Sequence, residues 1–451
     1  MKFLKPIILL LFFFKAGAQT TGSLEGQWYR FGVKNTAVYT LDLNFLKNYV
    51  KDVKKVNPQK IRVFSAGPFQ LPQPNSSNRS ATLNELPVWT NDTDGRFDSK
   101  DFIKFLGVST HQVGRNSEGK FYHQINPYSD SSFYYINISN FDSKKIVSHQ
   151  PQSGTAEPGM LYFEYEENEY KNVLNSGREW LGDFFYSKFT KKFKAFDKIS
   201  DINIRLDIMG IGRADQDLNI AINNKNLIST TLPLSYFNPV DAYARYNRYA
   251  NLKSLVFASE EDDSEIELSV STPNSASAGA YIDSWEFWYE RQLRFSKNIN
   301  SIFWPKNISE KQYNIKDAGA LTKVWQLDSL FYPEELLISP SGDFTMISSE
   351  NHSKVFLFDA GQVIYPDFSG IPNASLDLEA KKPQILVIFP EKFRTEAQKL
   401  IEFKKDSQNL EVLGISTQEV YDRFSGGKTD PTAIRDLCRF FWKKDNKTLK
   451  F

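Results

Sequence analysis

Two strand-then-helix units near the C-terminal end constrain the fold of this chain most strongly. The hydrophobic pattern predicts strands at 384–389 and 410–415 and helices at 391–405 and 432–444. Strands joined by a crossover helix pair in parallel, and parallel sheets need both faces covered. Two strands do not complete such a domain. We therefore expect the chain to be the N-terminal part of a longer protein whose chemistry lies downstream of Phe451.

The chain before residue 384 has the pattern of β structure. Aromatic residues make up 15% of the sequence, with 37 Phe and 21 Tyr, and such residues suit pleated, half-buried surfaces. Short extended runs lie between Trp28 and His149, where a helix is predicted only at Leu43 to Val56. Further runs alternate apolar and polar residues as sandwich strands do, at 202–208, 218–222, 254–258, 265–271 and 285–293.

The predicted fold class is therefore mainly β. We expect an N-terminal β-rich domain and a jelly-roll-like β-sandwich, followed by the first part of an α/β domain. The predicted division is a signal peptide at 1–18, the N-terminal β-rich domain at 19–150, the β-sandwich at 151–310, a β-rich connecting region at 311–382 and the start of the α/β domain at 383–451.

The N-terminus has the features of a secretory signal peptide. Lys2 and Lys5 precede an apolar run from Ile7 to Phe14, and the small residues Ala16 to Ala18 form a cleavage site. The run is too short to span a bilayer. We expect export to the cell surface, in association with the outer membrane.

The charge balance argues against nucleic acid as a partner. Lys and Arg number 55, against 54 Asp and Glu, so no overall field attracts a polyanion. The single cysteine, Cys438, excludes an intramolecular disulfide.

Four segments in this order resemble one known family. They are Trp89 to Gly107, Ser176 to Phe185, Ala280 to Arg291 and Tyr421 to Arg435. Together they resemble the sortases of the type IX secretion system, which belong to the gingipain-type, caspase-like cysteine peptidases. The resemblance spans nearly the whole chain after the signal peptide.

The resemblance implies a cell-surface endopeptidase and transpeptidase. Such an enzyme removes the C-terminal sorting domains of secreted cargo proteins and works with an outer-membrane barrel partner. The catalytic His and Cys of the family follow the segment at which this chain ends, so no catalytic residue is carried over. The α/β residues from 383 onward are expected to begin the caspase-like, gingipain-like domain.

Cys438 is a weak candidate nucleophile. It lies in a predicted helix whose apolar positions include Ile434, Leu437 and Phe441, which places its side chain toward the core. A reactive thiolate needs a neighbouring base, and all four histidines are remote in sequence. We interpret Cys438 as a small buried apolar residue.

An acidic loop around Gly95 is a candidate calcium site. With Gly95 at position six of a calcium loop, Asp92, Asp94, Asp98 and Asp101 occupy positions three, five, nine and twelve. Thr90 at position one departs from the pattern. The alternative is an Asp-Gly turn in which Asp98 caps the following turn. No cofactor is required by either interpretation.

A second function class remains open, namely a non-catalytic surface adhesion or carbohydrate-binding protein. Its candidate platform is a group of aromatic residues, Tyr281, Trp285, Phe287, Trp288 and Tyr289. With a period of two, three of them share one strand face and Trp288 takes the other, which favours core positions on at least one side. The acidic run Glu260 to Asp263 is interpreted as a solvated hairpin tip.

Overall fold

The computed structural model describes residues 25–77, 83–173, 180–212, 214–235, 252–260, 265–272, 279–329, 331–348, 353–372 and 378–444. The predicted signal peptide, residues 176–179 of the second family segment and residues 261–263 of the acidic run lie outside this set. No helix within the described residues is long and apolar enough to cross a membrane.

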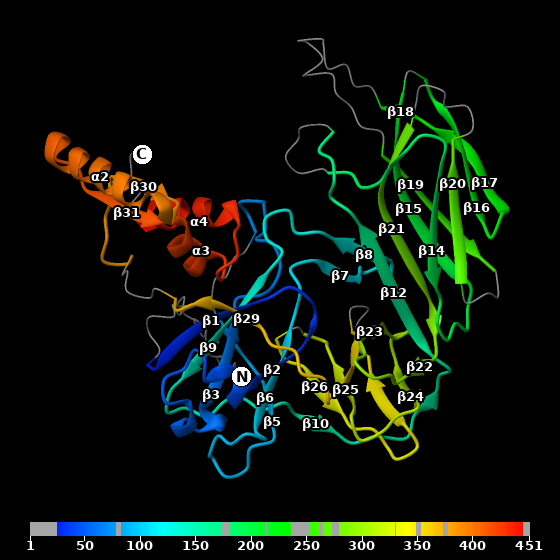
Figure 1. Ribbon diagram of the computed structural model, residues 1–451, viewed down its shortest axis with the longest axis horizontal. Helices are drawn as coiled ribbons and strands as arrows, with labels where there is room; N and C mark the ends of the chain where they lie inside the picture. Colours follow the sequence, from blue (N-terminus) through cyan, green and yellow to red (C-terminus); the bar gives the residue numbers. More distant parts are fainter. Residues whose placement is uncertain are drawn as a thin grey trace, which may run out of the picture.

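The first β region consists of two sheets around one core (Figure 1). One sheet has the order β29-β1-β9-β3-β4 and the other β2-β6-β5. The strands are β1 Gln27–Val33, β2 Ala37–Asp42, β3 Ile61–Ser65, β4 Asn84–Leu86, β5 Trp89–Thr90, β6 Phe102–Gly107, β9 Ser132–Ile138 and β29 Asp367–Gly370. Phe31, Leu41, Ile103 and Ile136 lie in the core between them. Strand β29 returns from far downstream, so this region closes only late in the chain.

The helix predicted at Leu43 to Val56 is wrong in length. Helix α1 covers only Leu43–Leu46, and single 3-10 turns follow at Val53–Lys55 and Pro58–Lys60. The Asn48 side chain donates to the backbone oxygen atoms of Asn44 and Phe45, each at 3.2 Å. A side chain that competes in this way for the carbonyl groups of a helix favours its termination.

An eleven-stranded sheet is the main element of the β structure beyond the first β region. Its order is β10-β26-β25-β28-β23-β12-β21-β15-β18, with β13 beside β21 and β19 beside β15. The strands are β10 Ser148–His149, β12 Met160–Glu167, β13 Phe184–Phe185, β15 Ile202–Ile211, β18 Leu234–Ser235, β19 Leu252–Ser259, β21 Gly279–Arg291, β23 Asn300–Trp304, β25 Thr322–Gln326, β26 Glu334–Leu336 and β28 Val355–Asp359.

Two smaller sheets pack on this large sheet and enclose separate cores. The first, β14-β20-β16-β17, covers β15 and β21 and buries Leu206, Ile220 and Phe287. The second, β11-β24-β22 with β27 beside β24, covers β23 and β28 and buries Phe303 and Leu357. Their strands are β14 Lys188–Lys194, β16 Gln216–Ile222, β17 Lys225–Leu232, β20 Glu265–Ser271, β11 Thr155–Ala156, β22 Leu293–Arg294, β24 Glu310–Lys316 and β27 Asp343–Ile347.

The first β region and the large sheet share a further hydrophobic cluster, here called the junction core. It consists of Val38, Leu106, Val108, Trp325, Leu327, Phe356 and Phe358. The first three belong to or follow strands of the first β region, and the others belong to or follow β25 and β28 of the large sheet. Because every member is nearly free of solvent contact, the two regions form one packed body.

A β-hairpin extends this connection. Strands β7 Gln112–Arg115 and β8 Phe121–Gln124, here called the hairpin arm, project from the first β region onto the large sheet (Figure 1). Phe121, next to the turn of this hairpin, packs against Phe163 of β12 and Trp304 of β23. The Arg115 Nη1 atom donates to the backbone oxygen of Pro305 at 2.8 Å.

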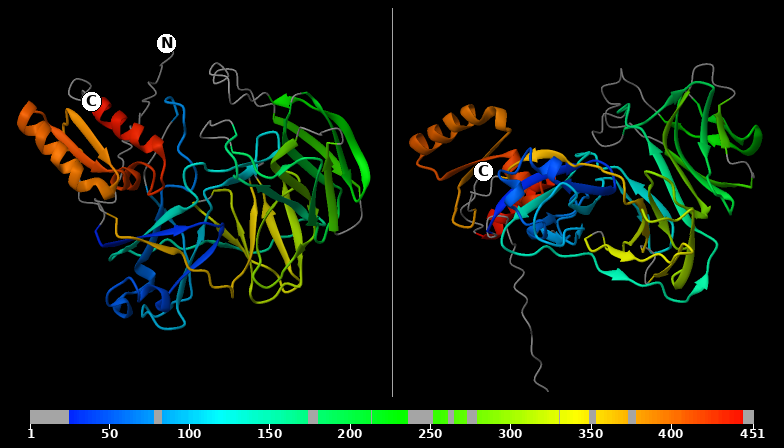
Figure 2. Two further views of the ribbon diagram at one scale, coloured as in Figure 1. Left: turned by 45° about the horizontal axis from the view of Figure 1, so that its top comes forward. Right: turned by 60° about the horizontal axis from the view of Figure 1, so that its bottom comes forward.

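The C-terminal α/β unit lies over the first β region, at the end of the molecule opposite the β-sandwich (Figure 2). Strands β30 Ile385–Phe389 and β31 Val412–Ser416 pair in parallel, as predicted. The helices are α2 Arg394–Gln408, α3 Thr417–Phe424 and α4 Pro431–Lys444, with a 3-10 turn at Glu391–Phe393 before α2. The sequence prediction missed α3.

The predicted fold class is confirmed: β sheets dominate and an α/β unit follows them. Four predicted sandwich runs coincide with β15, β16, β19 and β20, and the fifth falls within the longer β21 except for its last residues. The predicted domain boundaries stay predictions. In the structure, β23, β25 and β28, from either side of the predicted boundary at 310, belong to the same sheet as β12.

Candidate functional site

The α/β unit contacts the first β region through residues Ser425 to Asp430, here called the docking loop. Lys428 in this loop is only 2% exposed. Its Nζ atom donates to the backbone oxygen of Gly67 at 2.6 Å and to that of Ser425 at 2.7 Å. Burial lowers the pKa of Lys428 to about 8, against the opposing charge of Asp430. Burial of the Lys428 ammonium costs free energy, which its hydrogen bonds to the carbonyl groups offset in part. These hydrogen bonds form only when the carbonyl groups are held at fixed positions, so the contact depends on exact geometry.

Two glycines allow the docking loop to approach its support. Gly426 and Gly427 have φ angles of 62° and 91°, which strain other residues. A Cβ atom on Gly426 would lie 2.5 Å from the Cβ atom of Ala66. A Cβ atom on Gly427 would lie 2.9 Å from the hydroxyl oxygen of Tyr135. The two glycines therefore allow the docking loop and its support to approach closely.

A buried ion pair joins α3 to the first β region. Arg30 on β1 is 8% exposed and donates through Nη1 to the Asp422 carboxylate. Its Nη2 atom also donates to the backbone oxygen of Ser369 at 2.9 Å. Burial raises the pKa of Asp422, while the Arg30 charge opposes that rise. Breaking such a pair leaves an uncompensated buried charge, so we expect α3 to depend on Arg30 for its position.

Asp430 has two structural roles at the start of α4. Its Oδ1 atom accepts from the backbone N–H of Thr432 at 2.8 Å, which caps the N-terminus of α4. Its Oδ2 atom accepts from the backbone N–H of Leu71 at 2.8 Å. Arg435 on α4 donates to the backbone oxygen of Gln73 at 2.6 Å. The first turns of α4 are thereby tied to one extended segment of the first β region.

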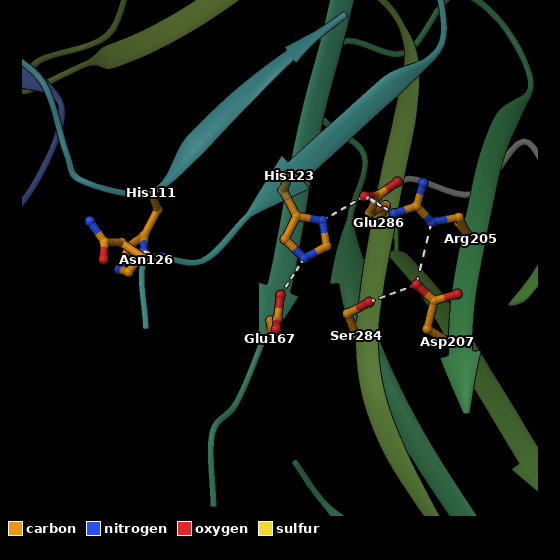
Figure 3. A network of polar contacts seen from close by, with 8 residues as sticks. All are labelled: His111, His123, Asn126, Glu167, Arg205, Asp207, Ser284 and Glu286. Atoms are coloured by element: carbon orange, nitrogen blue, oxygen red, sulfur yellow. Dashed lines mark hydrogen bonds and ion pairs between the residues drawn. The ribbon is translucent and has the colours of Figure 1, made fainter. Parts of the chain in front are cut away.

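A second polar site anchors the hairpin arm (Figure 3). His123 of β8 lies between two carboxylates, with Nδ1 at 2.5 Å from Glu286 and Nε2 at 2.6 Å from Glu167. Its ring stacks on that of Tyr165, with centroids 4.4 Å apart. Arg205 also pairs with Glu286 and lies 3.5 Å from an Asp207 carboxylate oxygen.

The charge state of His123 excludes a role as a general base near neutral pH. Burial alone lowers its pKa, but hydrogen bonds and charges from Glu167 and Glu286 raise it to about 9. The imidazole is therefore an imidazolium that neutralises two carboxylates, and it has no free nitrogen to accept a proton. We assign His123 a structural role, which is to fasten the hairpin arm to β12 and β21.

The predicted calcium loop forms a chain of turns in the structure. Asp92 accepts from the backbone N–H of Gly95 at 3.1 Å, and Asp98 accepts from that of Lys100 at 2.8 Å. Asp94 accepts from Arg96 and Asp101 accepts from Asp98, again through backbone N–H groups. Within the part of the chain that the structure describes, no three His, Cys, Asp or Glu side chains converge as a metal site. The Asp-Gly turn accounts for these contacts, and calcium stays a prediction.

Cys438 has the environment predicted for a structural residue. It is half-buried on α4, and burial raises the pKa of its thiol. A raised pKa disfavours the thiolate that nucleophilic catalysis requires. His111 and His123 belong to the first β region and its hairpin arm, and within the described part of the chain neither makes a hydrogen bond to Cys438.

The candidate aromatic platform belongs largely to the core. Trp285, Phe287 and Tyr289 are buried in one sandwich core, while Trp288 faces the other side and lies 6.3 Å from the Phe121 ring. This is the division between strand faces that the period of two predicted. Tyr281 remains partly accessible, and its ring lies tilted against that of Phe184, with centroids 4.8 Å apart.

Local sequence patterns do not reveal the residues that make the two polar sites. Lys428 and Asp422 lie inside a segment singled out for its family resemblance, but their partners are 361 and 392 residues away. His123 carries no local motif. The one usable local signal was the capping box of Ser416 and Glu419, which marks the start of α3.

Comparison with known proteins finds a family match within the C-terminal unit. Residues 378–451 match Peptidase family C25. No curated protein sequence matches the chain significantly. Among solved structures, dimeric latent PorU from Porphyromonas gingivalis is similar over 94% of this chain, with a TM-score of 0.76 and 16% identity. This chain spans 40% of the length of that PorU chain.

Other similar structures share only parts of the fold. A CBM36-1 domain of a multidomain xylanase from the hindgut metagenome of Trinervitermes trinervoides covers 28% of this chain and 95% of its own, at 7% identity and a TM-score of 0.20. A carbohydrate-binding module CBM36 in complex with calcium and xylotriose covers 28% of this chain and 98% of its own, at 14% identity and a TM-score of 0.20. Neither similarity supports a functional argument.

The PorU likeness covers both β regions and the α/β unit, and the family match begins just before β30. The family resemblance is thus confirmed in fold and in the C-terminal match: the chain has the fold of the corresponding part of PorU, and residues 378–451 match Peptidase family C25.

Proposed function

We propose that residues 25–372 are the support on which a gingipain-type cysteine peptidase domain is docked, and that the protein is a type IX secretion sortase. The support holds the peptidase domain at a fixed position relative to the β-sandwich. Its substrates are the C-terminal sorting domains of secreted cargo proteins. The proposed site of action is the cell surface, with an outer-membrane barrel as partner.

The docking loop is the observation that carries this proposal. It lies within the segment that matches Peptidase family C25, and it contacts the first β region through Lys428, Gly426 and Asp430. Several buried contacts of this kind fix the position of one domain on another. A domain that moves freely on a linker does not need them. A peptidase that acts on the end of a large cargo protein needs such a fixed orientation.

The chemistry proposed for the family is attack of a thiolate on a peptide carbonyl, followed by acyl transfer to water or an amine. Cys438 does not supply that thiolate in this proposal, because it is half-buried on α4 and its pKa is raised. The catalytic His and Cys are expected in the family domain beyond the docking loop.

The alternative of a carbohydrate-binding surface is weakened by the placement of its platform. Trp285, Phe287 and Tyr289 fill a core and present no stacking face to a sugar. A glycan array probed with the purified protein tests this alternative directly, and we expect no saturable binding to any sugar.

A cleavage assay tests the proposed function. The product of the complete coding sequence is incubated with a reporter protein that ends in a C-terminal sorting domain, and mass spectrometry identifies the products. We expect cleavage before the sorting domain. The Cys438→Ala variant should cleave normally, whereas Gly426→Val should cleave more slowly because its side chain collides with Ala66.

Gly319→Ala is the matched control, since a Cβ atom there meets nothing within 4 Å. Absence of any cleavage by the folded protein would reject the sortase proposal. Loss of cleavage in Cys438→Ala alone would reject the structural role assigned to this cysteine.

A further inference from the structure

A cleft between the first β region and the large sheet, lined in part by Val113 of the hairpin arm, belongs to neither polar site. Its volume is about 470 Å³, within the usual range for small-molecule sites. Apolar side chains from both regions form most of its wall, among them Val108, Phe163, Ile302, Trp304 and Phe356. The cleft therefore presents an apolar surface that two rigidly joined regions hold open.

Lys354 is the unusual member of this wall. It immediately precedes β28, is half-buried and lines the cleft, and its Nζ atom is 6.0 Å from the centroid of the Trp304 ring. Among the described residues, no carboxylate or carbonyl group makes an ion pair or hydrogen bond with this ammonium. Burial lowers the pKa of Lys354 to about 8, with no neighbouring charge to oppose it. An ammonium in an apolar cleft without an anion is costly, and an anionic ligand would relieve that cost.

The other charged groups around the cleft lie nearer its rim. Lys34, Asp130 and Glu164 are exposed side chains that line it. His111 is half-buried, and its Nδ1 atom accepts from the backbone N–H of Asn126 at 3.1 Å. Burial lowers the pKa of His111, so the neutral ring carries its proton on Nε2 as a second donor at the cleft.

We propose that this cleft binds an organic carboxylate with an aromatic or aliphatic body, whose carboxylate pairs with Lys354 while its apolar part lies against Phe163, Ile302 and Phe356. This site is separate from the docking loop, and it stands whether or not the proposed function does. The occupant has a negative charge and an apolar group close together, because the cleft joins one half-buried cation to an apolar wall.

Calorimetric titration with N-acetyl-L-phenylalanine and with its neutral amide tests the proposal. The two probes differ only in the charge, so the native protein should bind the acid about tenfold or more tightly than the amide. Lys354→Met should remove that preference, and Lys354→Arg should keep part of it. Lys47→Met is the control, because Lys47 is exposed and does not line the cleft.

The pH dependence gives a second readout. Affinity for the acid should fall between about pH 7 and about pH 9, as Lys354 loses its proton, while affinity for the amide stays constant. Equal affinities for acid and amide in the native protein, or absence of saturable binding of the acid, would overturn the proposal. So would unchanged acid binding in a Lys354→Met variant that keeps its native circular dichroism spectrum.

Discussion

The first β region meets its two neighbours in very different ways. Toward the large sheet it contributes Val38, Leu106 and Val108 to the hydrophobic junction core. Toward the α/β unit it offers polar partners, the Arg30 side chain and the Gly67 carbonyl group, beside an apolar contact from Leu71. Apolar burial is strong and non-directional, whereas hydrogen bonds to buried groups demand exact positions. Apolar packing therefore holds the two β regions together, whereas polar contacts fix the orientation of the α/β unit on the first β region.

The junction core should show the largest effect of any single change. Trp325→Ala removes a side chain that is 1% exposed at the centre of this core. We expect a loss of about 3 to 5 kcal/mol in the free energy of unfolding, measured by urea denaturation. Phe393→Ala is the control, since Phe393 is 49% exposed. If only one β region lost stability in the Trp325 variant, the two regions would not form one body.

The buried ion pair should show the next largest effect, confined to the α/β unit. Arg30→Ala leaves the Asp422 carboxylate buried with its charge uncompensated, at a cost of roughly 3 kcal/mol. Limited proteolysis should then cut within α3 and α4 while the β regions resist. Arg394→Ala breaks an exposed pair with Glu391 and should leave the pattern unchanged. If the protease cut α3 and α4 equally fast in both variants, the Arg30 pair would not be what holds the α/β unit in position.

The hairpin arm makes both apolar and polar contacts, and only the polar contacts should depend on pH. The pKa of His123 is raised to about 9 in the folded protein, so its contribution is complete below an unfolded value of about 6.5 and is lost as pH rises through 9. We expect a loss of roughly 2 kcal/mol over this range, less than the full shift implies because Arg205 also neutralises Glu286. Thermal unfolding at a series of pH values measures it.

His123→Gln should flatten this pH dependence without abolishing the fold, because Phe121 still packs against Phe163. A wild-type stability that is constant from about pH 6 to about pH 9 would contradict the imidazolium assignment.

The acidic loop of the first β region should show the smallest effect. If Asp92 and its neighbours bind calcium, then millimolar calcium raises the melting temperature, and Asp92→Asn removes the rise. The turn interpretation predicts no rise, because the Asn side chain can still accept from the Gly95 N–H. Differential scanning fluorimetry with calcium, and with magnesium as control, separates the two.

The sequence predicted elements better than contacts between them. Alternation assigned Trp285 and Trp288 to opposite faces of β21 because side-chain direction depends only on local periodicity. The same local reasoning extended α1 too far, since the Asn48 side chain ends it by a specific hydrogen bond. Neither Arg30 nor Lys428 has a neighbour in sequence that reveals its partner. The candidate site is built from such pairs, so periodicity could not predict it.

Hydrogen–deuterium exchange of α3 and α4 in Gly426→Val is the most direct test of the docking loop as the anchor of the family C25 segment. A Val side chain at this φ of 62° would overlap Ala66, so the account predicts faster exchange in α3 and α4 and unchanged exchange in β1, β9 and the junction core. Gly319→Ala should match the native protein throughout. Native exchange rates in α3 and α4 of Gly426→Val would contradict the account, because the α/β unit would then keep its position without the loop.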